Sequence, residues 1–205
     1  MHPSNKAALL GLFNKHDNLS VAVIPTAWDT YPSERKATEI EQQLVVFKQW
    51  GFSTSLLELT TVNGPDLKQR LTGKDLVWVM GGNSFYLNYF IHKSGFSGIV
   101  KDFLGNGMVY GGESAGAVVA GATLHGVEKV DDPKESPEVV WEGMGLVSSG
   151  VLPHWGWEKY RELIQSAKSE MVKFSPVITI NNDDAIIFID DTYEIIKNSS
   201  TENAA

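Results

Sequence analysis

Ser114 is the residue of this sequence best placed to do chemistry. It is the middle residue of Gly-Glu-Ser-Ala-Gly at positions 112–116, directly after an apolar run at residues 108–110. This spacing is typical of a nucleophile elbow, a tight strand-to-helix turn that exposes a serine hydroxyl and needs small residues two positions before and after it. The alternative is that Gly112 and Gly116 only let a helix pack closely on a sheet. Because the motif follows a predicted strand and opens a predicted helix, we favour a nucleophilic serine.

A serine hydroxyl needs a general base at neutral pH, and the chain offers five histidines. His154 follows the extended segment 150–153 and precedes Trp155, a setting typical of a residue that enters a site from the end of a strand. His125 is expected about three helical turns beyond Ser114 and pointing away from it. The sequence therefore predicts His154 as the base. The other histidines lie in the N-terminal segment or late in a predicted helix: His2, His16 and His92.

A catalytic histidine needs a third group that fixes its tautomer. Residues 180–185 join two predicted strands and supply Asn182 and Asp184, which share one face if this segment is extended. Only an acid stabilises the imidazolium by charge. We therefore favour Asp184 as the partner of His154, with Asn182 as the alternative.

A second glycine turn, at residues 81–83, follows the predicted strand 75–80 and precedes a helix. If this strand lies beside the strand that leads to Ser114, backbone N–H groups of Gly82 and Ala115 can form a two-donor oxyanion hole. The alternative is a simple turn. Four side chains near these motifs are expected around a substrate: Asn83, Glu113, Trp155 and Arg161.

Strand and helix patterns alternate through the first 120 residues or so. Four short apolar runs predict buried strands at residues 21–24, 54–59, 75–80 and 108–110. Apolar residues at helical spacing predict a helix over 33–50, and weaker patterns predict helices over 66–71 and 84–93. This alternation predicts an α/β fold with a mostly parallel sheet flanked by helices.

The remainder of the chain is expected to complete one domain over residues 1–197. Residues 129–140 are rich in charged residues and proline, which predicts an exposed loop. A helix over 157–173 and strands at 177–180, 185–189 and 193–196 follow. Residues 198–205 are expected to be a disordered tail.

Composition excludes several classes of function. The 205-residue chain has a net charge of -8, and its seventeen Lys and Arg residues are scattered, which argues against a nucleic-acid groove. The absence of cysteine excludes disulfide scaffolds and cysteine zinc sites. No apolar run approaches the roughly 20 residues of a membrane span, and no signal-peptide pattern is present. We expect a cytoplasmic protein without cofactor or metal, and leave a homodimer open.

Three motifs occur in an order that points to one family: Met-Gly-Gly-Asn-Ser-Phe at 80–85, Gly-Glu-Ser-Ala-Gly at 112–116 and Leu-Pro-His at 152–154. With these motifs the chain resembles the peptidase E family of serine peptidases over residues 20–197. The resemblance implies a fold related to class I glutamine amidotransferases, also used by cyanophycinases, and hydrolysis of dipeptides with N-terminal aspartate. It implies Ser114 as nucleophile, His154 as base, and the amides of Gly82 and Ala115 as the oxyanion hole.

The chain departs from this family in three places. Family members usually begin with an apolar strand, whereas this chain starts Met-His-Pro-Ser. The resemblance therefore leaves open whether the sheet has its usual first strand. The known aspartyl dipeptidases carry a glutamate as third triad member, where a gapless register puts Asn182. They also have an arginine-rich stretch after the histidine, where this chain has only Arg161 within reach.

Two other functions compete with a peptidase. An esterase of the α/β-hydrolase type takes its acid from between serine and histidine, and here only the acids of residues 131–142 are available. The order serine, histidine, then Asp184 fits the peptidase better. A binding protein descended from such a hydrolase, without catalysis, is the other alternative.

Overall fold

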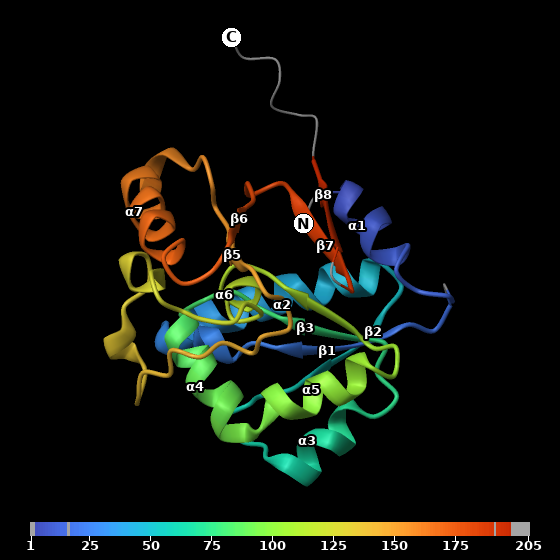
Figure 1. The fold of residues 1–205 in the computed structure, drawn as a ribbon. Helices are drawn as coiled ribbons and strands as arrows, with labels where there is room; N and C mark the ends of the chain where they lie inside the picture. Colours follow the sequence, from blue (N-terminus) through green and yellow to red (C-terminus); the bar gives the residue numbers. More distant parts are fainter. Residues whose placement is uncertain (1–2, 16, 191, 198–205) are drawn as a thin grey trace.

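The computed structural model describes residues 3–15, 17–190 and 192–197 (Figure 1). Residues 198–205, for which a disordered tail was expected, lie outside the described residues. His2 and His16 lie outside them as well.

A four-stranded parallel sheet forms the centre of the fold, in the order β2-β1-β3-β4. Its strands are β1 (Ser20–Ile24), β2 (Ser53–Leu56), β3 (Leu76–Val79) and β4 (Val109–Gly112). The inner strands β1 and β3 are almost wholly buried, as apolar runs must be when helices cover both faces of a sheet. The predicted fold class, a mostly parallel sheet flanked by helices, is confirmed.

Helices cover both faces of this sheet (Figure 1). On one face Phe47 packs with Val21 and Trp78, and on the other face Ala22 and Val77 join a separate apolar cluster. Successive residues of a strand point to opposite faces, which is why neighbours such as Val21 and Ala22 enter different clusters. The first face is covered by α2 (Ser33–Gln49), and the second by α3 (Gly64–Leu71), α4 (Ser84–Ser94) and α5 (Phe96–Leu104).

Two of the described helices were not predicted from the sequence. One is α5 (Phe96–Leu104), which follows α4 after the single residue Gly95, with φ 78°. The break at Gly95 interrupts the helical spacing of apolar residues, so this spacing does not reveal α5 as a second helix. The other is α1 (Pro3–Leu10), which precedes β1. Within residues 3–15 and 17–19 the chain forms this helix and no strand, so the described sheet begins with β1.

The C-terminal part adds two small sheets. Strand β5 (Gly150–Leu152) pairs in parallel with β6 (Val177–Thr179), and α7 (Arg161–Met171) connects them. Strands β7 (Ala185–Ile189) and β8 (Thr192–Ile196) form an antiparallel hairpin. The strands predicted here are confirmed to within one residue at either end.

Some predicted boundaries are wrong. The helix after Ser114 is α6 (Ala115–Val118), a single turn, so His125 does not lie three helical turns along it. His125 instead stacks between the rings of Trp141 and Phe174, with centroids 4.4 and 4.2 Å away. The helix predicted to start at residue 157 begins as the 3-10 helix η4 (Glu158–Tyr160). The predicted loop 129–140 contains η3 (Pro133–Glu135) and follows η2 (Val127–Lys129).

The helices in the described ranges are all too short or too polar to cross a lipid bilayer.

Phe47 is predicted to be a major contributor to stability. Its ring is fully buried, with the rings of Phe52 and Trp78 each 5.4 Å away. We expect Phe47→Ala to lower the free energy of unfolding by about 3–5 kcal/mol, because it leaves a cavity between α2 and the sheet. Urea denaturation measures this, with Val45→Ala on the exposed side of α2 as the control, expected to stay within about 0.5 kcal/mol of the parent. A loss for Phe47→Ala as small as that of the control would contradict the prediction.

Candidate active site

Ser114 occupies the turn between β4 and α6, in a backbone conformation that side chains rarely adopt. Its φ is 49° and its ψ is -113°. Such a conformation is costly for a residue with a side chain and persists only where the surroundings impose it. Among the described non-glycine residues, positive φ occurs at Asn18, Ser114, His154 and Asp190. Two of these four are the predicted nucleophile and base.

Close backbone approaches explain the small residues on either side of Ser114. A Cβ atom on Gly112 would lie 2.4 Å from the carbonyl oxygen of Gly116, and a Cβ on Gly116 would lie 2.2 Å from that of Val79. Any side chain at these positions would push α6 away from the sheet. The buried Tyr110 hydroxyl donates to the Gly116 carbonyl at 2.6 Å and fixes the same turn from below.

His154 meets Ser114 from a different sheet. It follows β5, and its Nε2 lies 2.9 Å from the Ser114 Oγ. Its own φ of 64° turns the chain sharply after the strand. The Trp155 N–H then donates to the carbonyl of Ile180 at 3.0 Å, which ties the histidine turn to the end of β6. The predicted pairing of serine and histidine is therefore present in the structure.

The other ring nitrogen of His154 contacts Asn182. Its Nδ1 lies 2.7 Å from the Asn182 Oδ1. An amide oxygen can only accept, so this bond places the proton on Nδ1 and leaves the Nε2 lone pair facing the Ser114 hydroxyl. An extended segment would favour Asp184 for this place, on charge. The chain bends at Asn182 and Asp183 instead, and Asn182 is the residue brought to the ring.

The second glycine turn lies beside the first. Strands β3 and β4 are paired neighbours, as the oxyanion-hole hypothesis required, and a Cβ on Gly81 would lie 3.1 Å from the Ser114 Cβ. Gly82 has φ 131°, and a Cβ there would lie 2.2 Å from the carbonyl oxygen of Ala27. Within the described ranges we find no acceptor for the N–H of Gly82 or of Ala115. Two backbone donors therefore remain available beside the serine.

Two partly buried carboxyl groups border these turns. Glu113 accepts the Gly81 N–H at 3.5 Å, and Asp131 accepts the Ser84 N–H at 2.9 Å at the start of α4. Burial raises the pKa of both groups, while the bonds that they accept and the nearby His154 oppose the rise. The sequence offers Asp131 only as one of several acids in a predicted loop, because nothing in the sequence shows that the loop folds back onto α4.

The remaining residues expected around a substrate have different surroundings. Asn83 is buried, caps α4 by accepting from the N–H groups of Phe85 and Tyr86, and donates to the Asp132 carbonyl, so its side chain serves the fold in place of a substrate contact. Trp155 and Arg161 line a pocket of about 180 Å³ together with residues of α7, and His154 is not among its lining residues; Arg161 also pairs with Glu158. In the described ranges no three His, Asp or Glu side chains gather into a metal-binding group.

Known proteins match this chain over most of its length. The sequence model of peptidase family S51 matches residues 2–196. An uncharacterized peptidase of Listeria monocytogenes is 26% identical over 168 residues, which are 82% of this chain and 80% of that protein. An uncharacterized peptidase of Pasteurella multocida is 26% identical over 85% of this chain and 84% of its own.

Solved structures share the fold. A peptidase E candidate from Listeria monocytogenes superposes with a TM-score of 0.82 at 22% identity, covering 95% of this chain and 93% of its own. A peptidase from an acI-B1 Actinobacterium gives a TM-score of 0.73 at 16% identity, covering 96% and 83%.

The raised pKa of Glu113 predicts a pH-dependent effect on stability. The folded protein holds a proton on Glu113 at pH values where the unfolded chain has lost it, so stability falls as pH rises through this window. We expect Glu113→Gln to be more stable than the parent at neutral pH, with the difference vanishing as pH falls toward about 4, where the unfolded carboxyl is protonated too. Urea denaturation across this pH range measures the effect. Glu138→Gln, at an exposed position, is the control, and equal behaviour of the two variants would contradict the prediction.

Proposed function

Because the chain belongs to peptidase family S51, we propose that it is a serine peptidase that hydrolyses dipeptides or other small peptides through an acyl-enzyme on Ser114. Family membership supports a peptidase of the peptidase E type. The observation that carries the proposal further is the chain of contacts from Ser114 Oγ to His154 Nε2, at 2.9 Å, and from His154 Nδ1 to Asn182 Oδ1, at 2.7 Å.

In the proposed first half-reaction, Nε2 of His154 takes the Ser114 hydroxyl proton while Oγ forms a bond to the scissile carbonyl carbon. The carbonyl oxygen becomes an oxyanion, which the N–H groups of Gly82 and Ala115 stabilise. The C–N bond then breaks, His154 returns the proton to the leaving amine, and the acyl group stays on Ser114. In the second half-reaction His154 takes a proton from water as the water oxygen bonds to the acyl carbon. The bond from this carbon to Ser114 Oγ then breaks, His154 returns the proton to Oγ, and the acid product leaves.

Asn182 has a defined part in this scheme. Its amide oxygen holds His154 in the tautomer whose Nε2 accepts a proton, but it adds no full charge to stabilise the imidazolium. The partly buried acids Glu113 and Asp131 lie close enough to His154 to interact with its charge. We propose that Asn182 positions the His154 ring, and that Glu113 and Asp131 supply the negative charge that stabilises its imidazolium form.

A dipeptide library that includes Asp-X substrates tests the proposed reaction. Family likeness favours Asp-X, but Arg161, the arginine that follows His154, is already paired with Glu158, so we expect a side-chain preference that is not limited to aspartate. A fluorophosphonate probe complements the screen. A folded protein that hydrolyses no peptide and is not labelled at Ser114 would support the non-catalytic binding protein instead.

Ser114→Ala is expected to abolish hydrolysis, a loss of at least about a thousandfold in kcat, because the bond-forming oxygen is removed. The fold should survive, since the change removes one oxygen from a partly exposed side chain. Initial rates on the best dipeptide and circular dichroism measure the two effects. Ser169→Ala on the exposed side of α7 is the matched control. Residual activity within tenfold of the parent would exclude Ser114 as the nucleophile.

Asn182→Ala is expected to lower kcat by about tenfold or more, the equivalent of one lost hydrogen bond to a catalytic group. KM should change little, because Asn182 acts on His154 and not on the substrate in this scheme. Asp184→Ala is the comparison and should have the smaller effect. A larger loss for Asp184→Ala than for Asn182→Ala would identify Asp184 as the third member of the triad. Full activity of both variants would indicate that Ser114 and His154 work as a dyad.

A further inference from the structure

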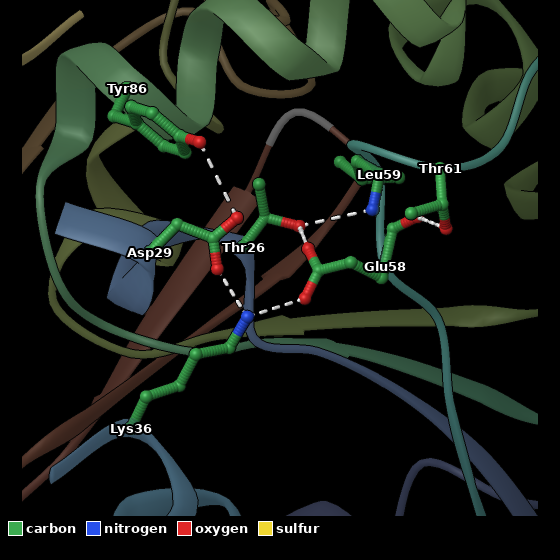
Figure 2. Close-up of polar contacts among 7 residues, drawn as sticks. All are labelled: Thr26, Asp29, Lys36, Glu58, Leu59, Thr61 and Tyr86. Atoms are coloured by element: carbon green, nitrogen blue, oxygen red, sulfur yellow. Dashed lines mark hydrogen bonds and ion pairs between the residues drawn. The ribbon is translucent and has the colours of Figure 1, made fainter. Parts of the chain in front are cut away.

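A polar network centred on Lys36 surrounds the 3-10 helix that contacts the second glycine turn, and Figure 2 shows its members. We call it the Lys36 network; it consists of Thr26, Asp29, Lys36, Glu58 and Tyr86. We propose that the Lys36 network is a positioning device for the oxyanion hole, which fixes the Gly82 N–H by holding the 3-10 helix η1 (Thr26–Thr30) in place. This inference rests on the proposed function.

The network ties η1 to three other elements. The Lys36 ammonium, on α2, donates to Asp29 and, at 2.6 Å, to Glu58 in the segment after β2. The Thr26 hydroxyl donates to Glu58 and accepts the N–H of Leu59 at 3.1 Å. The Tyr86 hydroxyl, on α4, lies 3.4 Å from the other oxygen of Asp29. Both ends of η1 are thus held by side chains from outside it (Figure 2).

Ala27, the second residue of η1, makes the contact that reaches the site. Its carbonyl oxygen accepts the Asn83 N–H at 3.0 Å. A Cβ atom on Gly82 would lie only 2.2 Å from the same oxygen. The backbone of Gly82 is therefore packed directly against Ala27. A shift of Ala27 therefore changes the direction of the Gly82 N–H.

A short 3-10 helix does not hold such a position by itself. Runs of this kind have poor hydrogen-bond geometry, and η1 is only five residues long, with the bonds from Trp28 N–H to Pro25 and from Tyr31 N–H to Trp28 at its two ends. Its position must come from outside contacts. Charged groups contact the side chains of η1 at two places among the described residues. One is the Lys36 network, and the other is the Arg35 guanidinium, which lies 5.1 Å from the centroid of the Trp28 ring.

Lys36 supplies the positive charge that offsets the repulsion between the carboxylates of Asp29 and Glu58. Asp29 and Glu58 are only 18% and 25% exposed, and Lys36 lies between them. Burial opposes the charge of Lys36, but its bonds to the two carboxylates outweigh this and raise its pKa, so it remains an ammonium group. Without Lys36 the two carboxylates would face each other without a counter-charge, and η1 would move.

The effect of such a movement on catalysis is expected to be specific. An oxyanion donor acts on the transition state, so its displacement lowers kcat and leaves KM nearly unchanged. Misplacing a catalytic group by about 1 Å costs on the order of a hundredfold. A purely structural ion pair would change the free energy of unfolding without this division between kcat and KM.

The test compares Lys36→Met, which removes the charge and keeps the stem, with Lys36→Arg and with Lys48→Met on the exposed face of α2. Kinetics use the best dipeptide of the library, and affinity is measured for the matching peptide aldehyde, whose adduct with Ser114 places an oxyanion in the hole. Hydrogen exchange is followed over residues 26–31 and 81–86, with β4 as the internal reference for global stability. Asp29→Asn replaces Lys36→Met if the latter does not fold.

We expect Lys36→Met to lower kcat and aldehyde affinity by about tenfold or more, with KM within threefold of the parent. Lys36→Arg should restore most of the loss, and Lys48→Met should behave as the parent. Exchange over 81–86 should accelerate in Lys36→Met relative to β4. Folded Lys36→Met with parental kcat, or with unchanged exchange over 81–86, would overturn the inference. A parent that neither hydrolyses peptides nor is labelled at Ser114 would overturn the proposed function, and the exchange measurement would still decide whether Lys36 holds the Gly82 turn.

Discussion

The close approach of α6 to the ends of β3 and β4 is the constraint on which the site depends. At Gly112 and Gly116 the backbones lie so near that no Cβ fits, and Ser114 between them is held at positive φ. The cost of this conformation is met by the parallel sheet underneath and by the Tyr110 hydroxyl, which binds the Gly116 carbonyl. A looser turn would relieve the strain but would also withdraw the serine from His154.

The sequence predicts well those features that depend on local chain geometry. The central strands, α2 and α4, and the serine turn follow from apolar periodicity and from glycines at fixed spacing. The pairing of Ser114 with His154, 40 residues apart, also follows, because both residues come at the end of a predicted strand. Family membership then supports a peptidase.

Features that depend on how distant segments bend were not predictable in this way. Asp184 was preferred over Asn182 on charge, but a bend at residues 182 and 183 decides which side chain reaches the ring. The role of Asn83 as a buried helix cap depends on the loop around Asp132 folding over α4. The contact of Ala27 with Gly82 joins residues 55 positions apart, and no pattern in the sequence predicts it.

Ser114 and His154 belong to different sheets, and this division has a consequence for the protein during its own synthesis. The chain emerges from the ribosome from its N-terminus, so the four-stranded sheet and the serine turn are complete before β5, β6 and Asn182 have been made. At that stage the serine has no histidine partner. The nascent chain therefore carries an unpaired Ser114 until its last third docks, so the contact between the two side chains arises only in the finished molecule.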